Sequence, residues 1–364
     1  MKMKHRNDRL EKRRVVVTGL GVVSPNGVGA DAYKNSLRQG VSGIDTISSF
    51  DPSRLSCRVA GEVKNVGIDE LLPPRELKRT GRSVHLAIAA TREALQRAGL
   101  CPEGMSLAER QSWGVILGSG GGTADFVEEQ YRLYYNDQLR KISAYNVSSS
   151  TIGSLSSELS IHFGFHGPSH VISTGCTSST DALGYAFNLI RFGLADHFVA
   201  GGADATITPA IMQGFCVMQA VSTSHNDEPA QAMSLAIQDA SIAKDEVGYI
   251  ALHGTSTVLN DKTETRATKL CFGKHAHELP MSSVKSMIGH PQGASGSAGV
   301  VAAICGMNSG FLPPTINLDE SDPECDLNYI PNQSIPRSID IALCNCIGFG
   351  SKNSALVIER GALA

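Results

Sequence analysis

The sequence lacks several features that would place it in a common class at once. Its 364 residues carry a formal net charge of -3, so charge gives no argument for binding nucleic acid or an anionic membrane surface. No apolar run reaches the ~20 residues that a membrane-spanning helix needs. The basic segment 1–13 has no apolar stretch typical of a signal peptide, and we interpret it as a flexible tail.

Paired cysteine spacings are also missing. The nine cysteines are scattered, and Cys344 and Cys346 alternate with apolar residues, which is typical of a strand rather than of a metal-binding knuckle. We therefore expect reduced thiols, a cytoplasmic location and no bound metal. A dinucleotide-binding loop is incomplete too, because Gly19 and Gly21 have no third glycine and no suitably placed acidic residue. This argues against a nucleotide cofactor.

Strand and helix patterns alternate along the chain. Apolar residues make up 41% of it, enough for a sizeable core. The alternation predicts an α/β protein with largely buried sheets. Helices are expected over 76–98, from the turn at Cys176 to residue 191, after residue 233 and over 287–307. Strands are expected from residue 15 into a glycine turn, and at 113–118, 171–172, 197–203, 247–252, 341–346 and 354–359.

Cys176 lies where one predicted strand gives way to a helix. The strand ends before Gly175, and a helix rich in small residues follows at once through Ala182. Unpaired N–H groups and the dipole at a helix N-terminus favour a thiolate. Such a thiolate is suited to accept an acyl group. The ordinary alternative is a buried structural cysteine.

Two histidine motifs favour the catalytic interpretation. His253 begins the run His-Gly-Thr-Ser-Thr after an apolar segment, and His290 ends the run that starts at Lys285. A third glycine loop surrounds Phe349. Each histidine alone would more often be an ordinary polar residue. A cysteine, two loop histidines and a lysine together fit acyl-thioester chemistry, in which imidazoles stabilise or transfer charge.

These motifs resemble the β-ketoacyl-acyl carrier protein synthases over residues 14–359. The resemblance implies a thiolase-like fold of two related halves, 14–240 and 241–364, in α-β-α-β-α layers. It also implies a homodimer or a heterodimer with a related subunit. The matching segments are 18–25, Cys176, 253–257 with Asn260, Asp261 and Glu264, 285–290, 313–317 and 345–350.

The resemblance also implies a reaction. An acyl chain would move from a carrier protein to Cys176, and malonyl-carrier protein would lose carbon dioxide and attack the thioester to give a 3-oxoacyl chain. His253 and His290 would serve decarboxylation, and Lys285 would orient them. The backbone N–H groups of Cys176 and Phe349 would form an oxyanion hole, with Phe349 also gating the acyl pocket. The pantetheine arm would contact Thr255, Thr257 and Phe215.

The expected partner is an acyl carrier protein. Carrier proteins are acidic, so a basic landing surface is needed. No resident cofactor is implied, because phosphopantetheine arrives on the carrier protein, and neither nucleic acid nor membrane is expected as a partner. Five residues match the family's docking positions, although each could be an ordinary solvated charge: Arg75, Lys78, Arg79, Arg140 and Lys141.

The chain departs from the family pattern at three places. Several dozen residues that the family carries near Gln231, including closing strands of the first half, have no counterpart. A genuine deletion there would expose sheet edges and remove activity. Gly299 replaces a glutamate that usually accompanies the lysine, which weakens the expected Lys285 network. Ser351 and Lys352 replace the usual Gly-Thr, at a cost if positive φ is needed.

Several activities remain open at this point. The sequence around Cys176 is closer to ketosynthase subunits of aromatic polyketide systems than to fatty-acid enzymes, but the rest of the chain does not decide between them. A catalytically impaired, chain-length-factor-like partner subunit is the main alternative, although such subunits generally lack the cysteine. A thiolase would need a second catalytic cysteine, and a starter-unit synthase a Cys-His-Asn set.

Overall fold

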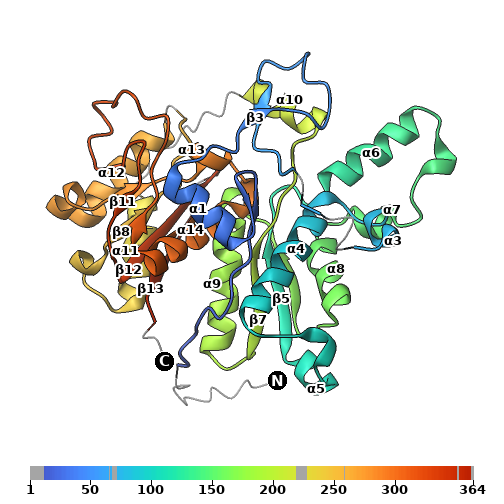
Figure 1. Cartoon of the computed structure of the whole chain (residues 1–364), viewed down its shortest axis with the longest axis horizontal. Helices are drawn as coiled ribbons and strands as arrows, with labels where there is room; N and C mark the ends of the chain where they lie inside the picture. The colour runs from blue at the N-terminus through green and yellow to red at the C-terminus, as the bar shows by residue number, and fades with distance from the viewer. Residues whose placement is uncertain are drawn as a thin grey trace, which may run out of the picture.

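Two β-sheets with helices between and outside them dominate the structure (Figure 1). It is a computed structural model that describes residues 12–64, 66–67, 72–218, 228–257, 259–350 and 352–361. The first sheet is parallel, in the order β6-β5-β7; the second has the order β13-β12-β8-β9, with β13 antiparallel to β12. Their strands are β5 (Trp113–Gly118), β6 (Ser169–Ile172), β7 (His197–Gly202), β8 (Tyr249–Ala251), β9 (Met281–Ser282), β12 (Ile341–Gly348) and β13 (Lys352–Glu359).

The helices complete five layers. α9 (Ser178–Arg191) and α14 (Ser295–Ser309) pack on each other between the two sheets. α4 (Arg82–Arg97) and α8 (Ser154–Phe163) form the outer layer of the first half, and α11 (Glu228–Ala240) and α12 (Asn260–Phe272) that of the second. This arrangement confirms the predicted α-β-α-β-α fold.

Helices on both faces explain why the central strands are continuous apolar runs. All six residues of β5 are buried, and Val115 and Leu117 belong to a core that includes Val84 and Ile88 of α4. In the second half, Ile250 of β8 belongs to a core with side chains of α11 and α12. Cys344 and Cys346 are buried on β12, as their alternation with apolar residues predicts.

The crossing of α9 and α14 depends on a glycine. A Cβ at Gly296 would lie 1.8 Å from Thr180 Oγ1 and 2.8 Å from the Thr180 backbone nitrogen. We expect Gly296→Ala to lower the free energy of unfolding by about 1–3 kcal/mol, because the backbone of α9 must move. Urea denaturation measures the change.

Gly299→Ala on the same helix is the matched control. A Cβ at Gly299 would meet only the Ala251 Cβ, at 3.6 Å. Because alanine favours helices over glycine, this change should be neutral or should stabilise the fold by up to about 1 kcal/mol. Equal destabilisation by the two substitutions would show that the α9–α14 contact is not as close as described.

The strand predicted from Val15 does not form. Val16 and Val17 are 56% and 60% exposed, and the described residues 14–21 contain no strand. In the first sheet β7 is an edge strand, and no described strand lies beyond it. A strand needs a neighbour for its backbone hydrogen bonds, and this segment pairs with no described strand, the edge of β7 included.

Two predicted helices are interrupted. The helix expected over 76–98 is divided into α3 (Pro74–Leu77) and α4, because the backbone at Gly81 is extended (φ -80°, ψ 165°). The helical stretch expected over 287–307 contains α13 (Lys285–Ile288), which ends at Gly289 with φ 74°, before α14 begins. The helix expected after residue 233 begins earlier, at Glu228.

Short elements connect these parts. The other α-helices in the described part of the chain are α1 (Ala30–Gln39), α5 (Leu107–Gln111), α6 (Ala124–Tyr135), α7 (Asn146–Ser149) and α10 (Pro209–Met218). Short strand pairs are β1 (Val23–Ser24) with β2 (Gly27–Val28), β3 (Asp45–Thr46) with β4 (Val59–Ala60), and β10 (Phe311–Leu312) with β11 (Ile335–Pro336). The 3-10 turns are η1 (Pro102–Gly104), η2 (Leu139–Lys141), η3 (Gly175–Thr177), η4 (Lys244–Glu246), η5 (Gly273–His277) and η6 (Gln292–Ala294).

Candidate active site

Cys176 lies in η3, between the end of β6 and the start of α9. Gly175 before it has φ 72°, a conformation that glycine adopts at little cost. The cysteine is 6% exposed. The predicted strand, tight turn and helix are therefore all present around this thiol.

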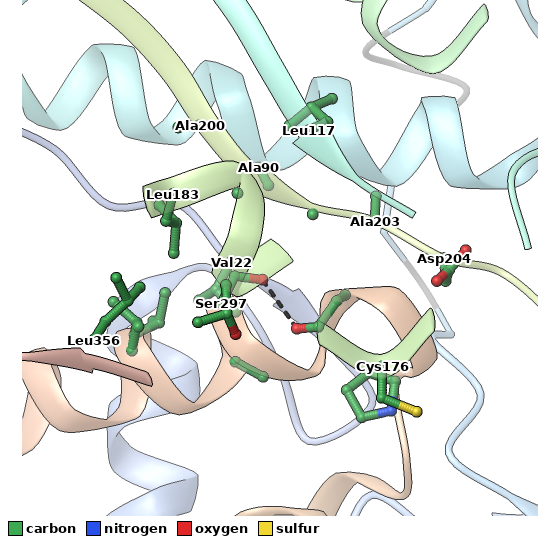
Figure 2. A pocket seen from close by; sticks show the side chains of 18 of the residues that line it. Val22, Ala90, Leu117, Cys176, Leu183, Ala200, Ala203, Asp204, Ser297 and Leu356 are labelled. Carbon is green, nitrogen blue, oxygen red and sulfur yellow. Dashed lines mark hydrogen bonds between the residues drawn. The ribbon is translucent and has the colours of Figure 1, made fainter. Parts of the chain in front are cut away.

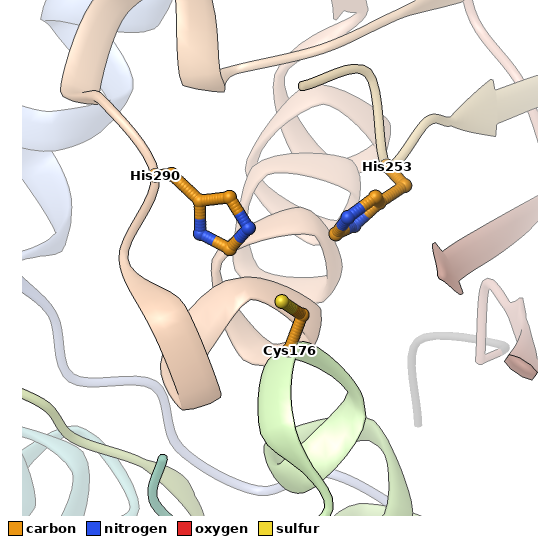
Figure 3. A group of neighbouring side chains, drawn as sticks. All are labelled: Cys176, His253 and His290. Carbon is orange, nitrogen blue, oxygen red and sulfur yellow. The ribbon is translucent and has the colours of Figure 1, made fainter. Parts of the chain in front are cut away.

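Cys176, His253 and His290 converge (Figure 3). His253 follows β8 and His290 follows α13, so both histidines come from the second half and the cysteine from the first. The Cys176 sulfur and one nitrogen of each ring all lie within 4.8 Å of one another. The two ring centroids are 5.4 Å apart, with the rings at 82°. The junction of the two halves thus brings together the three residues singled out in the sequence.

The thiol is harder to ionise than its position predicts. Burial raises the pKa of Cys176, and this outweighs the opposing effects of Lys285 and of the Cys176 and Phe349 backbone N–H groups. The backbone N–H groups favour the thiolate, as expected, but desolvation opposes the charged form more strongly, so the pKa is raised overall. Both N–H groups predicted for the oxyanion hole nevertheless contact the sulfur and favour negative charge there.

Hydrogen bonds to Nδ1 set the state of both histidines. His290 Nδ1 accepts from the Gln292 N–H at 2.9 Å. His253 Nδ1 lies 3.4 Å from Lys285 Nζ, which donates to the His253 carbonyl at 2.6 Å, and 3.4 Å from Cys346 Sγ. Burial holds the pKa of His253 well below its ordinary value and lowers that of His290 to about 3.

Both imidazoles are therefore neutral, with the proton assigned to Nε2. A neutral ring that accepts at Nδ1 donates from its other nitrogen. Two such donors suit an oxygen that develops negative charge. A metal ion at Nε2 would need that proton moved to Nδ1, where each ring already faces a donor. The chemistry of this cluster therefore favours a hydrogen-bonding site over a metal centre.

A buried carboxylate supports the His253 turn. Glu264 accepts from the backbone N–H groups of His253 and Gly254, both at 2.8 Å, and from Asn345 Nδ2 at 2.7 Å. Burial lowers the pKa of Lys285, and Glu264 is among the groups that oppose this. Glu264 in its ionised form therefore favours the charged lysine, and burial raises the pKa of Glu264 itself.

Cys346 was not identified as a site residue from the sequence. It donates from Sγ to the Cys176 carbonyl at 3.1 Å, and burial raises its thiol pKa to about 12. Its position two residues after Cys344 on a strand was the only signal, and that signal indicated no more than burial. The contact joins β12 of the second half to the turn that holds Cys176.

A cavity of about 2230 Å³ opens beside the site (Figure 2). Thr255 Oγ1 and Thr257 Oγ1 lie 3.3 Å apart on its wall. The cavity also extends along β7 and β13. All the residues expected to contact substrate line it: Cys176, His253, Thr255, Thr257, Phe215 and Phe349.

The five basic residues predicted to dock a carrier protein differ in availability. Arg75, in α3, and Lys78, directly after it, are exposed, and the Arg75 side chain hydrogen-bonds that of Tyr145. Arg79 is paired with Glu158, with side chains only 19% and 12% exposed, so its charge is already compensated. Arg140 and Lys141 are exposed in η2, on the segment after α6.

Comparison with protein families decides the identity. Residues 12–243 match the β-ketoacyl synthase N-terminal domain, and residues 210–319 match the β-ketoacyl synthase C-terminal domain. The chain belongs to the β-ketoacyl synthase family. This confirms the family inferred from the cysteine and histidine motifs.

Curated relatives come from two kinds of pathway. A 3-oxoacyl-[acyl-carrier-protein] synthase 2 of Synechocystis sp. is 32% identical over 96% of this chain and 99% of its own length. The tetracenomycin polyketide synthase ketoacyl synthase alpha subunit of Streptomyces glaucescens is also 32% identical, over 97% and 98%. Equal identity to both leaves the choice between fatty-acid and polyketide synthesis open.

Solved structures agree with the fold. The ishigamide ketosynthase/chain length factor has a TM-score of 0.89 at 25% identity, over 96% of this chain and all of that one. A type II PKS acyl-carrier protein in complex with its ketosynthase bound to the hexaketide gives 0.83 at 27% identity, with the same coverage. Among the described residues, no helix is both long and apolar enough to cross a bilayer.

Proposed function

We propose that this β-ketoacyl synthase condenses malonyl-carrier protein with an acyl chain held on Cys176, giving a 3-oxoacyl-carrier protein. The convergence of a thiol from one half with two neutral imidazoles from the other carries the proposal. Mass spectrometry of the acylated protein and release of carbon dioxide from malonyl-carrier protein test its two stages separately. No acylation and no release would refute it.

In the first stage Cys176 takes the acyl group. The sulfur attacks the thioester carbonyl, the carbon–sulfur bond to pantetheine breaks, and the thiol proton ends on the departing pantetheine sulfur. The Cys176 and Phe349 N–H groups, which contact the sulfur in the free protein, would hold the oxyanion of the tetrahedral intermediate. Thr255, Thr257 and Phe215 would contact the pantetheine arm from the cavity wall.

In the second stage malonyl thioester loses carbon dioxide. The electrons of the broken carbon–carbon bond form an enolate, whose oxygen would accept hydrogen bonds from His253 Nε2 and His290 Nε2. The enolate carbon attacks the Cys176 thioester and expels the cysteine sulfur. Lys285, bonded to the His253 carbonyl, would hold this ring in place. No resident cofactor is needed, since the pantetheine arrives on the carrier protein.

A carrier protein would dock through exposed basic residues near α3 and η2. We expect Arg75→Glu with Lys78→Glu to weaken binding of an acidic carrier protein roughly tenfold, because exposed charges act through attraction worth about 0.2–1 kcal/mol per pair. Binding across a salt series measures this, since exposed charges are screened over ~10 Å at 0.1 M ionic strength.

The matched control reverses two exposed charges in the other half, Lys274→Glu with Arg337→Glu. It makes the same net-charge change away from α3. If both double variants bind the carrier protein equally, general charge rather than this surface governs docking. The charges of Arg140 and Lys141 would then be reversed next. Reaction of each variant with a small acyl-thioester, which needs no carrier protein, checks that the site around Cys176 is intact.

A chain-length-factor-like role is the second candidate. The structural match to a ketosynthase/chain length factor and the glycine at position 299 favour it. The presence of Cys176, His253 and His290 favours the catalytic role. Incubation with an acyl donor separates them: a chain-length-factor-like subunit would stay unacylated at Cys176 while still binding a ketosynthase partner. For the catalytic role we also propose a dimer, either of two copies of this chain or of this chain with a related subunit.

The division into halves at residues 14–240 and 241–364, with a segment missing near Gln231, is part of the same proposal. The alignment to the Synechocystis relative runs over 415 positions, more than the 364 residues here. The two family domains both match residues 210–243. Both findings support missing residues in this region. Measurement of the intact mass of the protein tests whether the segment is absent.

We also propose that the protein works in the cytoplasm. Residues 219–227, Ser351 and residues 1–11 lie outside the described part of the chain.

A further inference from the structure

Asp204 lies just after β7 and gathers four hydrogen bonds. Its Oδ1 accepts from Ser119 Oγ at 2.7 Å and from the Gly121 N–H at 2.8 Å. Its Oδ2 accepts from the Gly120 N–H at 2.8 Å and from the Gly293 N–H at 2.6 Å. Three donors belong to the loop after β5 in the first half, and the fourth belongs to the second half. One carboxylate thus ties the two halves together.

The fourth donor belongs to the turn that orients His290. Gly293 is in η6, and the residue before it, Gln292, donates its N–H to His290 Nδ1 at 2.9 Å. Gln292 has φ 49°, which costs free energy in a residue other than glycine and needs support from its surroundings. A Cβ at Gly293 would lie 2.3 Å from the Gly120 nitrogen, so the two turns touch directly.

The same carboxylate acts on the nucleophile. Asp204 and Cys176 line one cavity (Figure 2), and the negative charge of Asp204 is among the causes that raise the pKa of Cys176. Desolvation raises the pKa of Asp204 itself, against the four donors that favour its ionised form. Removing the charge of Asp204 should therefore make the Cys176 thiol easier to ionise. It should also weaken the support of the turn that orients His290.

We propose that Asp204 is a positioning residue for His290: by binding Gly293 to the loop after β5, it holds η6 so that the Gln292 N–H fixes the Nε2–H form of the imidazole. The inference rests on the proposed function of His290 in the malonyl half-reaction. Asp204 touches neither acyl chain nor malonyl group in this role. It acts through the backbone of η6.

Asp204→Asn is the direct test. We call the four hydrogen bonds to the Asp204 carboxylate the clamp. An amide nitrogen cannot accept from an N–H group, so Asp204→Asn removes one of the two acceptor atoms of the clamp and keeps the shape of the side chain. We expect decarboxylation of malonyl-carrier protein to fall about tenfold or more, as for a weakened oxyanion donor, and acyl loading to stay within about threefold. Alkylation of Cys176 by iodoacetamide at a fixed neutral pH should become faster, because a negative charge near the thiol is gone.

Ser119→Ala and Asp125→Asn complete the set. Ser119→Ala removes one donor to Asp204 without changing charge, so it should slow decarboxylation and leave alkylation unchanged. Ser119→Ala also tests the role of Asp204 if the Asp204→Asn protein does not fold. Asp125 is another desolvated carboxylate, bonded to the Arg82 N–H. Asp125→Asn should leave the ratio of decarboxylation to acyl loading at its parent value. It should also leave the alkylation rate of Cys176 unchanged.

Nitrogen-15 NMR of the histidine rings gives a readout that needs no activity. The His290 signals, assigned by their loss in His290→Ala, should show the Nε2–H form in the parent and a shift toward the other tautomer in Asp204→Asn. Unchanged signals with parent decarboxylation would overturn the clamp, as would equal losses of loading, decarboxylation and alkylation. A parent protein that releases no carbon dioxide would refute the proposed function alone, since the NMR and alkylation comparisons still decide the clamp.

Discussion

Cys176→Ala should abolish acyl-enzyme formation. Of the two thiols at the proposed site, Cys176 lines the cavity and can accept the acyl group, whereas Cys346 is not among the residues that line it. Incubation with an acyl donor followed by peptide mass mapping should find label on Cys176 of the parent and none in the variant. Cys57→Ala, which removes an exposed thiol, should leave labelling unchanged. Label on another cysteine, with Cys176 unmodified, would contradict the assignment.

The pH dependence of Cys176 alkylation adds a check on the electrostatics. Because burial raises the pKa of this thiol, the thiolate forms at higher pH than in an ordinary cysteine, and the rate should still be rising where a free thiol has levelled off. Lys285 opposes that rise. Lys285→Met should therefore shift the profile further toward alkaline pH; a shift the other way would show that another group controls the thiol.

His253→Ala and His290→Ala should separate the two half-reactions. We expect each to reduce malonyl decarboxylation by about a hundredfold, the effect of losing one well-placed oxyanion donor, while acyl loading changes by less than about tenfold. Release of carbon dioxide and acyl-enzyme formation are measured separately. His277→Ala, which removes an exposed histidine, is the control. Parent rates of decarboxylation in both variants would remove the histidines from this role.

Neutral histidines also make a prediction about pH. Because the pKa of His290 is lowered to about 3, this ring gains no proton between pH 5 and 8, and burial lowers the pKa of His253 in the same direction. The decarboxylation rate of the parent should therefore show no acid limb from histidine in this range. A limb near pH 6.5 that disappears in His290→Ala would show a ring with an ordinary pKa.

Local sequence was enough to predict where Cys176 lies in the fold. Cys176 stands directly between a β-branched strand and a small-residue helix, and His253 directly follows another strand, so short-range patterns place them at strand ends. Strand ends in layered α/β folds gather at common edges, which is why these residues meet. The family resemblance then supplied their roles, which no spacing could have done.

The parts that the sequence did not predict depend on distant neighbours. The Val15 segment has the composition of a strand, but whether it pairs depends on what lies beside β7. The sign of the Cys176 pKa shift depends on desolvation by the residues folded around it. Asp204 has no motif of its own, because its donors come from two loops about 80–90 residues away along the chain.

Among the described residues, β7 has a strand neighbour on one side only, and this limits what can pair with its other edge. Along this strand, Phe198 to Gly202 offer uncharged, mostly small side chains, with none of the lysines or prolines that commonly blunt an edge. Unpaired backbone groups in such a row are a template for a strand of another molecule. A strand of another molecule would have to enter the cavity to pair here, because Phe198 to Gly202 are partly buried and line it.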